Sequence, residues 1–306
     1  MFNRILAVVR AEPDRDRPLL ERAMELTDPE ARLHLFAPVR NPLAGADYHF
    51  LTPELRHQVR HRALARARER VEDEMSGLHH RGHAAAYHLE WVSEGTAELI
   101  ARLAGEQDCD TVLMERELPG NQLSGDIRRF LRRNTERHTV LIQPGEHSAG
   151  EGAGRRPVLA AVETLRETPE ARTLATRILR DAAALAARLE RPLQVVTVAP
   201  DVHRIEEDLR HFLDTLEEPG ELLRAEHQQR LESLLESAGI EPRPTLWVRA
   251  GAPGRELPAL AGEQRPAYLV MGRSTAPAGL SAIWRTTNLE KVLAAVRCNV
   301  VVVPGE

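Results

Sequence analysis

The sequence contains one pattern of strands and helices twice, and this internal repeat constrains the fold more than any other feature. Short runs rich in Val, Ile and Leu alternate with long helix-forming segments, which is typical of βαβ units in a parallel sheet. In the first half the predicted strands are Ile5–Val9, Leu33–Ala37, His88–Val92, Thr111–Met114 and Thr139–Gln143. In the second half they are Val158–Val162, Leu193–Val198, Thr245–Val248, Tyr268–Met271 and Asn299–Val303. We therefore expect an α/β protein with two tandem domains, each a five-stranded parallel sheet flanked by helices.

The helical segments and the domain boundary agree with this interpretation. Residues 53–75 and 221–237 are rich in helix formers and occupy the same place in the two halves, before the third predicted strand. The segment 145–154 contains four glycines together with Ser and Ala, which is typical of a flexible linker. We therefore predict a first domain at 1–145, a linker at 146–154 and a second domain at 155–306.

Composition excludes several classes of protein. The net charge of −5 and the pI near 6.3 argue against a nucleic-acid partner. No apolar stretch approaches the roughly 20 residues that would span a bilayer, and the apolar N-terminal run is too short for a signal peptide. Cys109 and Cys298 are too far apart for a CxxC motif, and we interpret both as buried small apolar residues. These features predict a soluble cytoplasmic protein without a membrane or nucleic-acid partner.

Four histidines before the third strand raise the alternative of a metal site. His79 and His83 have the spacing of a zinc pair on a helix, and His80 and His88 lie nearby. Arg81 and Gly82 interrupt this segment, which we interpret as a loop, and no acidic or Cys ligand accompanies it. We therefore predict no metal.

The end of the second half contains a recognisable series of motifs. Gly272 follows a predicted strand, Gly279 lies in the next loop, and a Glu-x-Val-Leu helix at 290–293 precedes the final strand, which follows Cys298. This series resembles the C-terminal signature of universal stress proteins, and the turn at 251–253 resembles the Gly-x-Pro turn of that family. With both halves considered, the chain is most similar to the tandem E-type members. The resemblance implies the universal stress protein fold, which is similar to that of the adenine nucleotide alpha hydrolases.

The resemblance also implies a ligand site in the second domain. In ATP-binding members, a glycine loop brings backbone N–H groups close to the phosphates. The family places further glycines where this chain has Thr275 and Thr286, and an acidic residue where it has Glu163. Because ligands bind at the carboxyl ends of parallel strands, we predict a site for ATP or another adenine nucleotide in the second domain. Its predicted residues are Val162, Glu163, Val198, Met271, Gly272, Thr275, Gly279, Thr286, Thr287 and Asn288. The alternative is an ordinary strand-to-helix connection in which a Thr caps the helix.

The first half departs further from the family pattern. Glu115 stands where a glycine is expected, and a carboxylate there would repel phosphate; Arg10 stands where the acidic residue is expected. The following helix contains the pairs 128–129 and 132–133 of arginines, which we interpret as a solvated face, with an acidic partner as the alternative. The first domain is therefore predicted to have a degenerate nucleotide loop that does not bind ATP in the family manner.

Three functions remain open at this point. The leading hypothesis is a non-enzymatic stress-response protein that binds a nucleotide or another small ligand, since the sequence shows no P-loop, GxSxG or HExxH motif. The alternatives are a slow ATPase or autophosphorylating protein, and a ligand-free scaffold that binds a partner. We also expect the two domains to pair internally through the strands at 139–143 and 299–303, with a homodimer as a further assembly.

Overall fold

The protein is described by a computed structural model that covers residues 2–305 with several gaps. The described part omits residues 12, 29, 42–50, 93–94, 119–121, 135, 145–155, 166–167, 202–218 and 274–285. The predicted linker at 146–154 therefore lies outside the described residues. The chain divides into two compact units, Met1–Glu117 with Ser124–Ser148 and Leu118–Leu123 with Ala149–Glu306.

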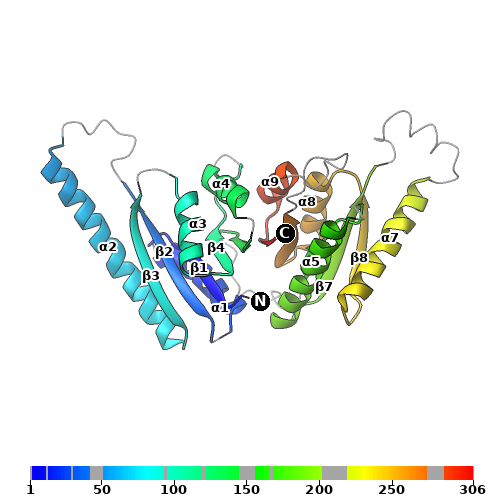
Figure 1. The fold of residues 1–306 in the computed structure, drawn as a ribbon, viewed down its shortest axis with the longest axis horizontal. Helices are drawn as coiled ribbons and strands as arrows, with labels where there is room; N and C mark the ends of the chain where they lie inside the picture. The colour runs from blue at the N-terminus through cyan, green and yellow to red at the C-terminus, as the bar shows by residue number, and fades with distance from the viewer. Residues whose placement is uncertain are drawn as a thin grey trace. The chain divides into compact units, whose positions relative to one another are not determined.

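The first unit alternates strands and helices along its whole length (Figure 1). Its strands are β1 Arg4–Val8, β2 Arg32–Arg40, β3 Ala84–Val92, β4 Thr111–Glu115 and β5 His138–Ile142. Its helices are α1 Pro13–Leu26, α2 Pro53–His80, α3 Ala97–Glu106 and α4 Gly125–Arg133. All strand pairs within the unit are parallel, in the order β3-β2-β1-β4-β5.

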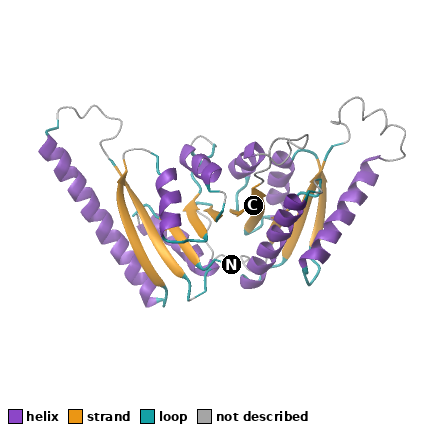
Figure 2. Cartoon of the chain, in the orientation of Figure 1, coloured by secondary structure: helices purple, strands orange, loops and turns teal. Residues whose placement is uncertain are grey.

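The second unit repeats this arrangement. Its strands are β6 Val158–Ala161, β7 Leu193–Ala199, β8 Thr245–Ala250, β9 Tyr268–Arg273 and β10 Asn299–Pro304. Its helices are α5 Pro169–Arg188, α7 Pro219–Ala238, α8 Pro253–Gln264 and α9 Thr286–Ala295. The strand order β8-β7-β6-β9-β10 is the same as in the first unit, and all pairs within it are parallel. The predicted fold class is therefore confirmed, with five parallel strands and flanking helices in each unit (Figure 2).

This strand order determines where a ligand site lies in each unit. The chain moves from β1 to β2 and β3 in one direction, and then returns to place β4 and β5 on the other side of β1. Right-handed crossovers then require α1 and α2 on one face and α3 and α4 on the other. The sheet has its topological switch point between β1 and β4, and a ligand cleft is expected beyond the carboxyl ends of these strands. The equivalent point of the second unit lies between β6 and β9.

Each sheet carries an apolar core built from small and branched side chains. In the first unit Ile5, Leu33 and Val112 are fully buried, and in the second unit Leu159 and Val270 are. Strands buried on both faces are expected to be apolar without alternation, which explains the continuous runs that identified them in the sequence. Cys109 and Cys298 are buried and make no disulfide, as predicted.

One segment differs from its sequence-based interpretation. The region around His79 was expected to be a loop, but α2 continues to His80 and β3 begins at Ala84. Arg81 and Gly82, with φ of +84° at Gly82, make the turn that joins them. Within the described ranges, no group of three His, Cys, Asp or Glu side chains could hold a metal ion. Nor does any described helix have the length and apolar character needed to cross a membrane.

Candidate functional site

The first unit contains a cleft of about 560 Å³ at the carboxyl edge of its sheet. The ends of β1, β2 and β4 form its floor, and the first turns of α3 and α4 and the middle of α2 form its walls. The cleft therefore lies at the switch point between β1 and β4, where the fold favours ligand binding. Its volume falls within the range of roughly 300–1,000 Å³ that is typical of small-molecule sites.

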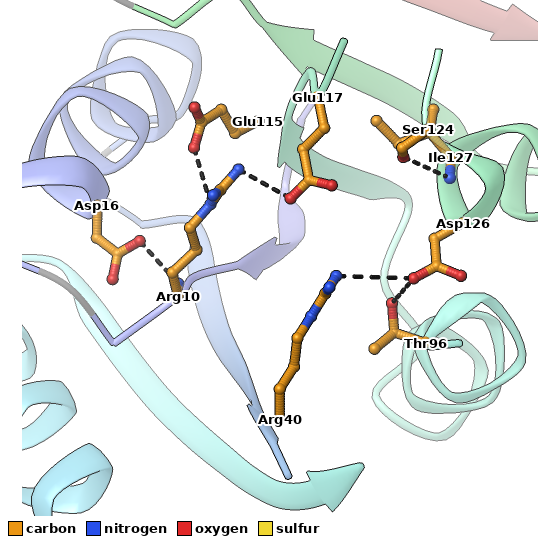
Figure 3. A network of polar contacts seen from close by, with 9 residues as sticks. All are labelled: Arg10, Asp16, Arg40, Thr96, Glu115, Glu117, Ser124, Asp126 and Ile127. Atoms are coloured by element: carbon orange, nitrogen blue, oxygen red, sulfur yellow. Dashed lines mark hydrogen bonds and ion pairs between the residues drawn. The ribbon is translucent and has the colours of Figure 1, made fainter. Parts of the chain in front are cut away.

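An arginine side chain lies in this cleft, at the switch point between β1 and β4 (Figure 3). Arg10 follows β1, and its guanidinium lies 3.0 Å from Glu115 Oε2 and 2.8 Å from Glu117 Oε1. The backbone N–H of Arg10 donates a hydrogen bond of 2.7 Å to Asp16 Oδ1 at the start of α1. Both the backbone and the guanidinium of Arg10 are therefore fixed in position. Because the two glutamates are paired with one cation, neither faces the cleft as an isolated charge.

A second cluster surrounds the first turn of α4, again as Figure 3 shows. Ser124 caps this helix, since its Oγ accepts a hydrogen bond of 3.3 Å from Ile127 N. Asp126 Oδ2 accepts a long hydrogen bond of 3.5 Å from Thr96 Oγ1 at the start of α3, and lies 3.8 Å from Arg40 Nη2. A carboxylate in the first turn is stabilised by the helix dipole. The carboxylate of Asp126, in α4, therefore contacts both the start of α3 and the end of β2.

The close approach behind Asp126 requires a glycine. A Cβ atom on Gly95 would lie 2.5 Å from Asp126 Oδ1 and 2.6 Å from Arg129 Nη1. No real Cβ tolerates such a distance, so a side chain at position 95 would displace Asp126. The turn before α3 is therefore adapted to the Asp126 cluster.

The four arginines of α4 lie on one face of the helix, opposite its buried side chains. Arg128, Arg129, Arg132 and Arg133 are all exposed. Arg133 pairs with Glu98 of α3 at 3.1 Å, and Arg129 lies 3.9 Å from Asp126. Their exposure agrees with the predicted solvated face.

In the second unit, several predicted site residues lie at the same edge of the sheet. Ala161 pairs with Met271 and with Val196 on the two neighbouring strands. Val162 and Glu163 therefore follow β6 beside the ends of β7 and β9, which carry Val198, Met271 and Gly272. Thr275 and Gly279 lie outside the described residues. The fold thus brings residues more than 100 positions apart to one edge of the sheet.

Gly272 is also required by packing, which the sequence did not reveal. A Cβ at this position would lie 2.6 Å from Ile178 Cδ1 and 3.0 Å from Leu174 Cδ2, both in α5. The absent side chain therefore allows α5 to pack against β9. A substitution here would disturb the α5 interface whether or not the residue approaches a phosphate.

The remaining predicted residues stand at the start of α9. Thr286 and Thr287 are its first two residues. Asn288 follows, and its Oδ1 would be 3.6 Å from a Cβ at Gly254, in the first turn of α8. The N-terminal turns of α8 and α9 therefore meet, as those of α3 and α4 do in the first unit.

Glu163 also borders a small cavity of about 100 Å³ between α5 and α7. Thr164 follows it, and Thr164 Oγ1 lies 2.6 Å from His227 Nδ1 and 2.8 Å from Thr197 Oγ1. Burial, with a smaller effect of Arg230, lowers the pKa of His227, so the neutral imidazole is favoured. This buried hydrogen-bonded group connects the end of β6 to α7.

Sequence reasoning missed the pairing of Arg10 with Glu115. Each residue was judged alone, as a lost acidic group and as a carboxylate that repels phosphate. A signal was nevertheless present, because residues that follow adjacent parallel strands meet at one edge of the sheet. An Arg after the first strand and a Glu after the fourth therefore indicate an ion pair.

Comparison with known proteins gives the family of the second unit. Residues 155–304 match the model of the universal stress protein family. The second unit is therefore a universal stress protein domain. No curated protein matches the chain in sequence.

Solved structures extend the likeness to the whole chain. A protein of unknown function from Pseudomonas aeruginosa PAO1 aligns over 99% of this chain and 93% of its own, with a TM-score of 0.69 and 18% identity. A putative universal stress protein from Pseudomonas aeruginosa UCBPP-PA14 has the same coverage and identity, with a TM-score of 0.68. A universal stress protein from Archaeoglobus fulgidus DSM 4304 covers 99% and 96%, with a TM-score of 0.64 and 14% identity. At these identities the likeness shows the fold alone, and it includes the first unit.

Proposed function

We propose that this universal stress protein acts in the cytoplasmic stress response by binding a small ligand and not by catalysing a reaction. The family of the second unit supports the general role in stress. The sequence contains no P-loop, which is typical of nucleotide hydrolysis, and no GxSxG motif, which is typical of acyl transfer, and this favours binding.

The proposed ligand of the second unit is ATP or another adenine nucleotide. The observation that carries this proposal is the position of Glu163 and Gly272 at the ends of β6 and β9, the strands on either side of the switch point. Glu163 would accept hydrogen bonds from the nucleoside, and the first turn of α9 would face the phosphates. Thr275 and Thr286 would offer hydroxyl groups where other members have glycines, and Thr287 would offer one beside them.

Two other functions would use the predicted site of the second unit differently. A slow ATPase or autophosphorylating protein would bind the nucleotide and release or accept its terminal phosphate. A scaffold would bind a protein partner and no nucleotide. Internal pairing of the domains through their last strands, and a homodimer, also remain predictions.

Three measurements on the full chain separate these functions. They are titration with ATP, an assay of released phosphate, and an assay of phosphate incorporated into the protein. Binding in the micromolar range without turnover supports the proposal. Binding with turnover or incorporation favours the enzyme, and the absence of binding favours the scaffold.

A conservative substitution tests the assigned position. Glu163→Gln keeps the shape of the side chain but removes its charge, so ATP affinity should fall about tenfold, the loss expected for one charge-assisted hydrogen bond. Glu236→Gln removes an equivalent charge from the exposed face of α7 and serves as the control. Equal affinities of both variants and the unmodified protein would contradict the assignment of Glu163.

A further inference from the structure

Apolar side chains from several elements form one part of the lining of the first unit's cleft, beside its charged groups. Val9 and Met114 at the strand ends, Val39 in β2, and Ile127 and Phe130 in α4 all border it. Ile127 and Phe130 are buried against the rest of the unit, so this wall is firmly positioned. An apolar wall in a concave site favours the apolar body of a ligand, because that body leaves water on binding.

The charges of this cleft divide into two sets. Glu115 and Glu117 are paired with Arg10, and Asp126 is adjacent to Arg40. These carboxylates already have cations beside them. A triphosphate placed at the switch point would therefore meet three carboxylates, and the two arginines beside them are already engaged.

The second set consists of two arginines on α2, Arg66 and Arg70, which lie one helical turn apart and both border the cleft. Arg70 Nη1 donates a hydrogen bond of 3.0 Å to the backbone oxygen of Ala11, which holds its guanidinium at the cleft. In the part of the chain that the structure describes, no carboxylate pairs with either arginine. Among these residues, the rim on this side therefore offers two positive groups to a ligand.

We propose that the cleft of the first unit binds a small organic anion, with an apolar body and a single carboxylate or sulfonate group. The body lies against the wall of Val39, Ile127 and Phe130, and the anionic group lies beside Arg66 and Arg70. An arginine fork suits a planar or tetrahedral anion because it offers two parallel N–H donors. This site is separate from the nucleotide site proposed in the second unit, and neither depends on the other.

A matched pair of fluorescent probes tests the charge requirement on the full chain. 8-Anilinonaphthalene-1-sulfonate and N-phenyl-1-naphthylamine share one aromatic body and differ by the sulfonate. We expect Arg66→Gln/Arg70→Gln to weaken binding of the sulfonate probe about tenfold and to leave the neutral probe unchanged. The control Arg62→Gln/Arg68→Gln removes two exposed charges from the same helix, outside the cleft, and should leave both probes unchanged.

A second variant tests the position of the apolar body. Ala63 is half-buried on α2 and borders the cleft, so Ala63→Trp should fill the space and weaken both probes together. Circular dichroism and thermal unfolding of each variant establish that the fold is kept. ATP at concentrations that saturate the second unit should leave the bound sulfonate probe in place.

Three results would overturn the proposal. One is a sulfonate affinity that the Arg66/Arg70 variant leaves intact, and another is an equal loss in the Arg62/Arg68 control. The third is displacement of the probe by ATP in the unmodified protein, which would assign the cleft to nucleotides instead. Failure of ATP to bind the chain at all would contradict the proposed function of the second unit, but it would not contradict the anion site proposed for the first unit.

Discussion

The two units have the same strand order but opposite charges at the end of the first strand. Arg10 follows β1 in the first unit, whereas Glu163 follows β6 in the second. At the end of the fourth strand, the first unit has Glu115, and the second has Gly272. In the first unit these two positions form an ion pair across the switch point. The second unit cannot form that pair, because glycine has no side chain.

This difference shows how a repeated backbone acquires different chemistry. Parallel strands always bring the same positions to the carboxyl edge, so exchange of two residues changes what the cleft accepts. The Arg10–Glu115 pair occupies the place where backbone N–H groups would approach a phosphate. The first cleft is therefore suited to a ligand that uses other groups, such as the two arginines on α2 that border it.

The largest expected effect comes from adding a side chain at Gly272. Gly272→Val should lower the stability of the second unit by about 3 kcal/mol, because the new Cβ would lie 2.6 Å from Ile178 Cδ1. The matched control is Gly262→Val in α8, where no atom lies within 4 Å of the added Cβ, and which should not lower stability. Urea unfolding of both variants gives the comparison. A stable Gly272→Val protein that fails to bind ATP would instead support a role of this glycine in phosphate binding.

A smaller effect is expected from the charge pair that distinguishes the first unit. Arg10→Met should destabilise the protein by about 2 kcal/mol. This loss lies between the losses expected for exposed and for buried ion pairs, because the side chains of Arg10 and Glu115 are both partly buried. A double-mutant cycle with Glu115→Gln should give a coupling energy of about 1 kcal/mol. High salt should reduce this energy only in part, since the pair is partly shielded from solvent. Strictly additive effects in the cycle would show that the two residues do not interact in solution.

Much of the fold was predictable because strands such as β5, β6 and β10 are buried on both faces. Continuous apolar runs such as those at 158–162 and 299–303 identify such strands without any need for alternation, and the structure places β6 and β10 there. The length of α2 was underestimated, since prediction ended it near Met75 and it continues to His80. The apolar stripe does continue at Leu78, which lies seven residues after Val71 and is buried, but Arg81, Gly82 and the histidines around them led us to expect a loop.

The candidate sites were less predictable than the fold. The residues of the second site were found by resemblance and by their places after strands, whereas the cleft of the first unit depends on groups from α2, α3 and α4 that no local motif connects. Arg66 and Arg70 lie in the segment 53–75, which the sequence identified only as rich in helix formers. The hydrogen bond of Arg70 to Ala11, 59 positions away, follows from tertiary packing that the sequence pattern does not encode.

The smallest effect concerns the pH dependence of stability, and it also compares the two units. Burial lowers the pKa of both His34 in β2 and His227 in α7 from the ordinary value of 6.5, with smaller effects of Arg32 and Arg230. Below that value the unfolded chain binds a proton that the folded chain resists, so stability falls as the pH decreases. His227 is 2% exposed and His34 is only half-buried, so His227→Gln should reduce this loss more than His34→Gln. Thermal unfolding of both variants between about pH 7.5 and pH 5.5 measures the difference. A larger change from His34→Gln would show that the Thr164–His227 hydrogen bond does not hold the imidazole in its neutral form.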